Sequence, residues 1–393
     1  MDGEFMIING TNFGDVLTGT GTADGDQIYG GAGIDTLNGL AGNDWLDGGN
    51  AADSLYGGSG DDFLLGRDSA DSLFGGDGAD LLHGGVGGDQ LFGGAGSDTL
   101  IGGENADTMD GGEGADVYYV DHVNDVIEDS YAGSVEIDVA FQSVSFNWGG
   151  NHRIEKVVMT GTANISFNNT SGTPVQEVRG NSGNNEFFGS AFAATQTFLG
   201  MDGDDTYTIL RPRYLSNREG ATIIEGYDAG HDTVRSGYSY ALTAHVEDLV
   251  LLKQITANGI GNGLDNVLSG SGGNNTLIGR EGNDTLVGNG GADTFVFDRA
   301  LGPNNQDYVA DFTTGEDKIL LHSNVFAALS SGQLAESEFH LGAAAADADD
   351  HVLYDMSTGT LRYDADGTGA GSAEIVATFG VNTVLTVDDF LIA

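Results

Sequence analysis

The chain has 393 residues, with 60 Asp and Glu against 13 Lys and Arg, which gives a formal net charge of -47 at pH 7. So negative a charge excludes nucleic acid as a partner, disfavours anionic membrane surfaces and requires something cationic to offset it. The 66 glycines argue against one large conventional core, and because cysteine is absent the fold needs a source of stability other than disulfides.

The sequence lacks the marks of a signal peptide and of a membrane span. Residues 1–8 contain no basic segment followed by an apolar one, and no stretch reaches the roughly 18 apolar residues that cross a bilayer. We therefore expect neither Sec export nor a transmembrane segment.

An aspartate recurs every nine residues over the first third of the chain. The series consists of Asp26, Asp35, Asp44, Asp53, Asp62, Asp71, Asp80, Asp89, Asp98, Asp107 and Asp116. Two residues after each aspartate is an apolar or aromatic side chain, from Ile28 to Tyr118, and glycines precede it, as Gly75 and Gly76 do in one unit. Glycine permits the positive φ angles of tight turns. Each unit is therefore predicted to be a turn followed by a short strand with one buried side chain.

These units resemble the G-G-x-G-x-D-x-U-x nonapeptide of the RTX family, the hemolysin-type calcium-binding repeat. The resemblance implies an all-β fold, a right-handed parallel β-roll (an RTX β-solenoid), over residues 10–120. In that family two nonapeptides form one turn, residues 18 apart stack, and Ca²⁺ lies between stacked loops. The resemblance thus places the eleven aspartates on calcium.

Electrostatics favours the same interpretation over a metal-free solenoid. Stacked strands lie about 4.8 Å apart, and two carboxylates at that distance repel by roughly 3 kcal/mol at an effective dielectric constant near 20. Carboxylate and carbonyl oxygens are ligands that suit Ca²⁺, and neither cysteine nor clustered histidine offers a transition metal a better site.

The two edges of the predicted roll differ at the fourth position of the loop. That position is glycine in every loop that ends at Asp44, Asp62, Asp80, Asp98 or Asp116. On the alternate edge, Ala51, Ser69 and Asn105 take its place in three loops. Because a β-carbon at a left-handed position costs about 1–2 kcal/mol, we hypothesise that the first edge binds calcium more tightly. The alternative is that these loops tolerate the change without loss of metal.

Residues 121–258 are predicted to be an irregular β connector, in which the solenoid continues with reduced or absent calcium binding. Partial turns occur near 180–208, at Asn185 and at Asp205, and we place Asp205 on calcium. Arg211, Arg213 and Arg218 form a basic loop that is either a contact site or an exposed loop paired with nearby acids.

A second predicted roll covers residues 259–298, again with a spacing of nine. Its positions are Asn266, Asn275, Asp284 and Asp293. Since a neutral amide oxygen is a weaker ligand, we expect calcium at Asp284 and Asp293 and a capping role for the two asparagines.

Residues 299–393 are similar to the β-rich C-terminal domain of serralysin-type secreted proteases. In that family the domain directs export through a type I secretion channel, and an acidic residue followed by a hydrophobic tail closes the signal. The resemblance assigns this role to Asp389, Phe390, Leu391, Ile392 and Ala393. The protease signature H-E-x-x-H is absent, so only the carrier half of such a protein is present.

No catalytic motif is recognisable. The sequence has no G-x-S-x-G, no cysteine nucleophile and no phosphate-binding loop with its lysine. We expect a secreted or surface-associated Ca²⁺-binding protein that is not an enzyme and has type I secretion machinery and an unidentified polysaccharide or protein as partners. Two alternatives remain: the folding and targeting portion of a larger effector, or a hydrolase or lyase with an unrecognised site in residues 121–258.

Overall fold

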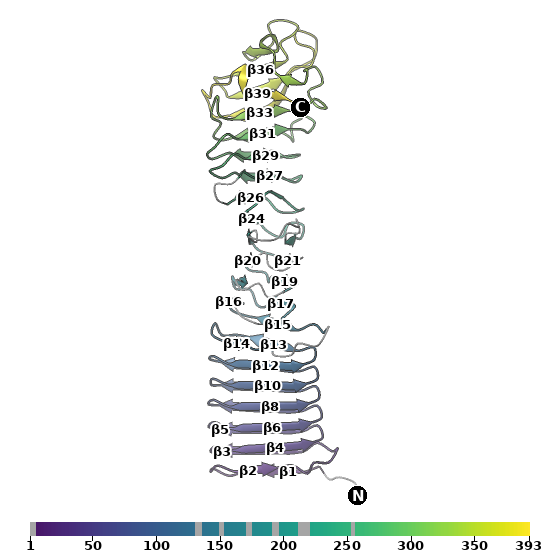
Figure 1. Cartoon of the computed structure of the whole chain (residues 1–393), viewed down its shortest axis with the longest axis vertical. Helices are drawn as coiled ribbons and strands as arrows, with labels where there is room; N and C mark the ends of the chain where they lie inside the picture. The colour runs from purple at the N-terminus through teal and green to yellow at the C-terminus, as the bar shows by residue number, and fades with distance from the viewer. Residues whose placement is uncertain are drawn as a thin grey trace. The chain divides into compact units, whose positions relative to one another are not determined.

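The computed structural model (Figure 1) describes residues 5–129, 136–148, 153–169, 175–190, 196–210, 221–252 and 256–393. The chain divides into two compact units. The first consists of Met1–Asp202 with Tyr214–Thr222, and the second of Gly203–Arg213 with Ile223–Ala393. Each unit is an all-β solenoid of stacked parallel coils, which confirms the predicted fold class.

Two facing rows of parallel strands build the regular coils of the first unit. One row consists of β1 (Ile7–Asn9), β3 (Gln27–Ala32), β5 (Trp45–Asn50), β7 (Phe63–Asp68), β9 (Leu81–Val86), β11 (Thr99–Glu104) and β13 (Val117–Val120). The other consists of β2 (Val16–Thr18), β4 (Thr36–Ala41), β6 (Ser54–Ser59), β8 (Ser72–Asp77), β10 (Gln90–Ala95), β12 (Thr108–Glu113) and β14 (Val126–Ile127).

The register of these strands follows the nine-residue period. β10 pairs with β12 so that Gln90 lies beside Thr108 and Leu91 beside Met109, which makes one coil of two nonapeptides. Side chains alternate between the two faces of a strand, and the residue two places after each aspartate, from Ile28 to Tyr118, is fully enclosed. The core is thus one column of apolar side chains between the two rows.

The coils beyond β13 continue in parallel but with uneven length. They contain β15 (Val139–Gln142), β17 (Lys156–Met159), β19 (Glu177–Arg179), β21 (Thr197–Leu199), β16 (Phe146–Asn147), β18 (Ser166–Asn169) and β20 (Glu186–Ser190). Larger side chains fill this part of the core, and the indole N–H of the enclosed Trp148 donates to Gln142 at 2.9 Å.

The second unit has the same two-row construction. One row contains β22 (Thr206–Leu210), β24 (Thr233–Ser236), β26 (Asp248–Leu251), β28 (Val267–Ser269), β30 (Thr285–Val287) and β32 (Asp307–Val309). The facing row contains β25 (Tyr240–Ala241), β27 (Asn258–Ile260), β29 (Thr276–Ile278), β31 (Thr294–Phe297), β33 (Lys318–Leu321) and β39 (Phe390–Ile392). β23 (Thr222–Ile224) lies between β22 and β24 in the sequence.

Antiparallel pairs appear only near the end of the described chain. β37 (Thr360–Tyr363) pairs antiparallel with β36 (Val352–Asp355) and β38 (Glu374–Phe379), and β34 (Gly332–Gln333) does so with β39. β35 (Phe339–Leu341) and the 3-10 turns η1 (Glu336–Glu338) and η2 (Val387–Asp389) complete this region.

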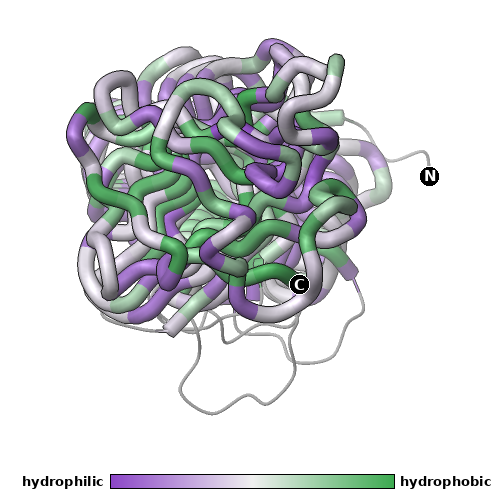
Figure 2. The backbone as a smooth tube through the Cα atoms, turned by 90° about the horizontal axis from the view of Figure 1, so that it is seen from above, coloured by the Kyte–Doolittle hydropathy of each residue, from purple (hydrophilic) through white to green (hydrophobic). Residues whose placement is uncertain are grey.

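Apolar and polar stretches alternate along the backbone (Figure 2), as expected for strands and loops in succession. Within the residues described, no helix is long and apolar enough to cross a membrane.

Candidate calcium sites

The repeating aspartates stack through a hydrogen bond between neighbouring coils. The backbone N–H of Asp62 donates to Oδ1 of Asp80, 18 residues later, at 2.7 Å. The same bond, at 2.6–3.1 Å, has as its donors Asp26, Asp35, Asp44, Asp53, Asp71, Asp80, Asp89, Asp98 and Asp107. The aspartates therefore form two continuous ladders, one along each edge of the coils.

The second oxygen of these carboxylates is enclosed by protein and accepts no hydrogen bond from any described residue. This holds for Oδ2 of Asp35, Asp44, Asp53, Asp62, Asp71, Asp80, Asp89, Asp98, Asp107 and Asp116, and for Asp284 in the second unit. A buried carboxylate oxygen without a partner is unfavourable by several kcal/mol. A repeated row of such oxygens therefore indicates a ligand set that is completed by a cation.

Burial raises the pKa of the ladder carboxylates. The pKa values of Asp62, Asp98 and Asp107 rise to about 7, chiefly because burial disfavours the charged form. The hydrogen bond from the neighbouring backbone opposes this rise, and the charges of adjacent aspartates add to it. Protons and a cation thus compete for the same oxygens.

The first glycine of each loop makes room for the ligand oxygens. A β-carbon on Gly75 would lie 2.3 Å from Oδ2 of Asp80 and 2.6 Å from the carbonyl oxygen of Gly93. Side-chain and main-chain oxygens therefore converge at this point. Such a set of hard oxygen donors is the type that binds Ca²⁺.

A family model of four copies of the RTX calcium-binding nonapeptide repeat matches residues 20–55, 47–82, 56–91, 83–118 and 260–295. These segments are RTX repeats. RTX nonapeptides bind calcium at multiple sites, so the ladders are calcium-binding elements and the cofactor prediction is confirmed. No curated protein matches the chain significantly.

In the second RTX block, residues 260–295, Asn266 and Asn275 stand where the other repeats have a charged aspartate. Their side-chain amides donate hydrogen bonds to main-chain carbonyl oxygens. The Asn266 side-chain N–H₂ donates to the carbonyl oxygens of Val246 and Glu247 at 3.2 and 3.0 Å, and its Oδ1 accepts the backbone N–H of Asn262. Asn275 likewise donates to Ala257 at 3.1 Å. An amide satisfies the surrounding carbonyls by itself, and the capping role of the two asparagines stays a prediction.

The remaining aspartates of the predicted set are Asp26, Asp205 and Asp293. Oδ2 of Asp26 accepts hydrogen bonds from the backbone and hydroxyl of Thr20 at 2.6 and 3.0 Å, so this rung is satisfied by protein. Asp205 donates its backbone N–H to Oδ1 of Asp232 at 2.8 Å, and it belongs to a ladder in the second unit. Asp293 is buried, and its backbone N–H donates to Oδ1 of Asp317 at 2.9 Å.

The premise of the edge hypothesis holds, since the fourth loop position is left-handed at Ala51, Ser69 and Asn105, with φ of 86–88°. Sequence reasoning missed that Leu40 and Arg67 at the second position are left-handed as well, with φ of 81° and 84°. One such residue lies on each edge, and the carboxylates of both edges have the same geometry. The difference in affinity therefore stays a prediction.

Five further aspartates of the ladders were not predicted: Asp125 continues the period of nine by one step beyond Asp116, and the other four fall outside that period. They accept the backbone N–H of an earlier aspartate at 2.8–3.1 Å and are Asp125, Asp138, Asp232, Asp307 and Asp317. Both ladders therefore extend into segments that do not match the repeat.

The C-terminal tail is part of the folded second unit. Asp389 is fully buried, and its carboxylate accepts the backbone N–H groups of Gly315 and Thr386 at 2.9 and 2.8 Å. Phe390 and Ile392 are buried in β39, which pairs with β33. The RTX match ends at residue 295. The basic loop of Arg211, Arg213 and Arg218 lies outside the described residues.

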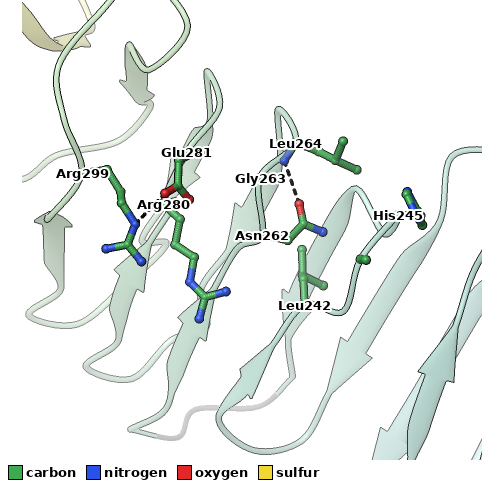
Figure 3. A pocket seen from close by; sticks show the side chains of 9 residues that line it. Leu242, His245, Asn262, Gly263, Leu264, Arg280, Glu281 and Arg299 are labelled. Atoms are coloured by element: carbon green, nitrogen blue, oxygen red, sulfur yellow. Dashed lines mark hydrogen bonds and ion pairs between the residues drawn. The ribbon is translucent and has the colours of Figure 1, made fainter. Parts of the chain in front are cut away.

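A hollow of about 440 Å³ lies beside the second RTX block (Figure 3). Arg280, Arg299 and His245 contribute to its lining. Arg299 forms ion pairs with Glu281 and Asp298 at 3.0 and 2.9 Å, so much of its charge is balanced locally.

Replacing a loop glycine next to a ligand oxygen is expected to weaken calcium-dependent folding. In Gly279→Ala the new β-carbon would lie 2.0 Å from Oδ2 of Asp284. In the matched variant Gly290→Ala the nearest atom is 3.9 Å away. We expect Gly279→Ala to lower the free energy of unfolding in calcium by about 1–3 kcal/mol, and Gly290→Ala to do so much less. Urea titrations in saturating calcium measure both, and equal losses would contradict the crowding argument.

Proposed function

We propose that this chain is a secreted structural or interaction protein that folds on Ca²⁺ outside the cell and has no catalytic activity of its own. RTX repeat proteins are usually secreted and calcium-binding. The observation that carries the proposal is the row of buried Oδ2 atoms that have no hydrogen-bond partner among the described residues, because such a row favours coils that need a cation to fold.

The proposed switch follows from the difference in calcium concentration across the cell envelope. Each RTX loop needs only modest affinity, because calcium at ten times the dissociation constant adds about 1.4 kcal/mol per site. Extracellular modules typically bind in the range of about 10⁻⁴ to 10⁻³ M. The ladders would thus stay largely empty and mutually repulsive inside the cell and become filled outside.

Burial of the tail supports export before folding. The proposed signal, Asp389 to Ala393, contributes β39 to the second unit, and the side chains of Asp389, Phe390 and Ile392 are inaccessible to a transporter once that unit has formed. Recognition by type I machinery therefore requires an unfolded chain, which low calcium would provide.

Deleting residues 389–393 is expected to abolish release into the medium from cells that carry a type I exporter. The matched control is Glu374→Gln, which changes one exposed charge in β38 of the same unit. Secreted and retained fractions are quantified by immunoblot. Circular dichroism of the purified deletion variant in calcium separates a loss of export from a loss of folding. Unchanged release of the deletion variant would contradict the assignment of the tail.

The interaction role is tested by incubating the labelled protein with the surface of the producing cells in millimolar calcium or in EGTA. Calcium-dependent retention with a captured surface component supports the proposal. Turnover of a surface polysaccharide during the same incubation would favour the alternative of an enzyme.

A further inference from the structure

Three buried carboxylates converge in the second unit, outside the segments that match the RTX repeat. Asp205, Glu225 and Asp232 each contribute one oxygen to a group in which all three atoms lie within 4.8 Å of one another. Their side chains are 1%, 7% and 0% exposed. The three residues flank the strands β22, β23 and β24.

The ligand composition of this cluster differs from that of a nonapeptide loop. Asp205 and Asp232 form a ladder rung through their 2.8 Å hydrogen bond. Glu225 lies two residues after the core-facing Ile223, and both side chains are buried. In β8 the corresponding place after Leu73 is taken by a glycine. Glu225 therefore places a third carboxylate at a position where the RTX loops have a glycine and no side chain.

Two of the oxygens in the cluster have no hydrogen-bond partner within the described part of the chain. These are Oε2 of Glu225 and Oδ2 of Asp232, and both are enclosed by protein. The other oxygen of Glu225 accepts a hydrogen bond from the buried hydroxyl of Tyr207. Tyr207 thereby fixes the carboxylate so that Oε2 remains available to a ligand.

Burial makes the cluster unfavourable without a counter-charge. It raises the pKa of Glu225 to about 8, a rise opposed by the bond from Tyr207 and increased by the charges of Asp232 and Glu247. It also raises the pKa of Asp232 to about 6. Either protons or a cation must therefore relieve the repulsion between these groups.

The same sequence of residue types occurs in the first unit, where the regular coils end. There Asp116 donates its backbone N–H to Asp138 at 2.8 Å, and Asp138 donates to Glu155 at 3.0 Å. A buried tyrosine, Tyr118, follows two residues after Asp116, and a buried acid, Asp129, follows two residues after a core isoleucine. In the second unit the corresponding last rung runs from Asp232 to Glu247 at 2.8 Å.

We infer that Glu225 joins Asp205, already predicted as a calcium ligand, and Asp232 in a divalent cation site for Ca²⁺ that lies outside the segments matching the RTX repeat. The ligands are oxygens only, which favours Ca²⁺ over transition metals. Glu225 adds a carboxylate at the place where the RTX loops have a glycine, so the site gains one negative charge over an RTX loop. Tyr207 acts as a positioning residue. The inference does not depend on the proposed export or surface role.

The direct test is a crystal structure of the full chain grown with Tb³⁺ in place of Ca²⁺, with anomalous difference maps. We expect peaks along the RTX ladders and one further peak between Asp205, Glu225 and Asp232. In Glu225→Gln the ladder peaks should remain as internal standards and the additional peak should be lost. Ladder peaks without a peak at the cluster in the wild type would overturn this inference and leave the proposed calcium-dependent folding intact.

Melting temperatures give a second readout whose sign separates the two states of the cluster. If the cluster binds no cation, Glu225→Gln only removes repulsion between the buried carboxylates. The variant should then melt no lower than the wild type in saturating Ca²⁺. With a bound cation, the wild type gains more from added calcium, and the variant should melt about 2–4 °C lower in saturating Ca²⁺. Glu374→Gln, an exposed change in the same unit, is the control. A variant that melts at or above the wild type in saturating calcium would overturn the inference.

Discussion

Chelation of calcium is expected to unfold the RTX blocks, with loss of most of the β-sheet signal in the far-ultraviolet circular dichroism spectrum. The aspartates of the nine-residue series, Asp26 to Asp116, are 1–3% exposed, and they stack from one coil to the next. Once calcium is removed, their buried charges face one another without a counter-ion. Six sites at about 1.4 kcal/mol each amount to roughly 8 kcal/mol, which is comparable with the whole stability of a domain.

The experiment compares spectra of the full chain in EGTA, after Ca²⁺ is restored and after Mg²⁺ is added instead. We expect Ca²⁺ to restore the spectrum and Mg²⁺ to fail, because Mg²⁺ demands near-ideal octahedral geometry and loses its water reluctantly. A β spectrum that persists in EGTA would show that the coils are stable without metal and would remove the basis for the switch.

Acid is expected to promote folding of the calcium-free chain, the opposite of ordinary acid denaturation. Burial raises the pKa of Asp62, Asp71 and Asp98 from the usual 3.8 to about 7 in the folded chain. The folded state therefore binds protons more tightly than the unfolded state. The resulting stability is fully present below the unfolded pKa and is lost as the pH rises through the folded pKa.

Circular dichroism in EGTA should therefore show β structure increasing as the pH falls from about 8 to about 5. Over the same range the calcium concentration for half-saturation should rise, because protons occupy the ligand oxygens. Sedimentation at each pH controls for association near the isoelectric point of about 4.1. Calcium-free β structure that stays constant or declines with acidification would contradict the raised pKa values.

The sequence predicted the regular part of the fold because a fixed period places equivalent residues in equivalent environments. The nine-residue aspartate series determines the register, as the pairing of Leu91 with Met109 shows. Where the loops between strands are longer, the nine-residue period no longer predicts which residues pair. Asp138 and Asp232 join the ladders across 22 and 27 residues, so spacing alone could not find them.

Glu225 was missed for a different reason. It belongs to the buried face only because the preceding strand places Ile223 in the core, and a lone glutamate two residues after an isoleucine has no distinctive signature. The signal available was a pattern that occurs twice: a tyrosine two residues after an aspartate, at Tyr118 and Tyr207, followed later by an acid two residues after an isoleucine, at Asp129 and Glu225. Leu40 and Arg67 were missed because their side chains do not favour the left-handed backbone that their loops require.

The hydrogen bond between successive rungs gives the ladder a direction. Oδ1 of each aspartate accepts the backbone N–H of the aspartate in the preceding coil, as Asp80 does for Asp62. Each coil therefore supplies a hydrogen-bond acceptor to the coil before it and not to the coil after it. Filling one loop with calcium therefore orders the acceptor that the preceding coil requires. Folding should then spread along the array in the manner of a one-dimensional chain of coupled units. The dependence of folding on calcium concentration should then become steeper with each added coil. The number of repeats therefore sets the width of the concentration range over which the protein folds.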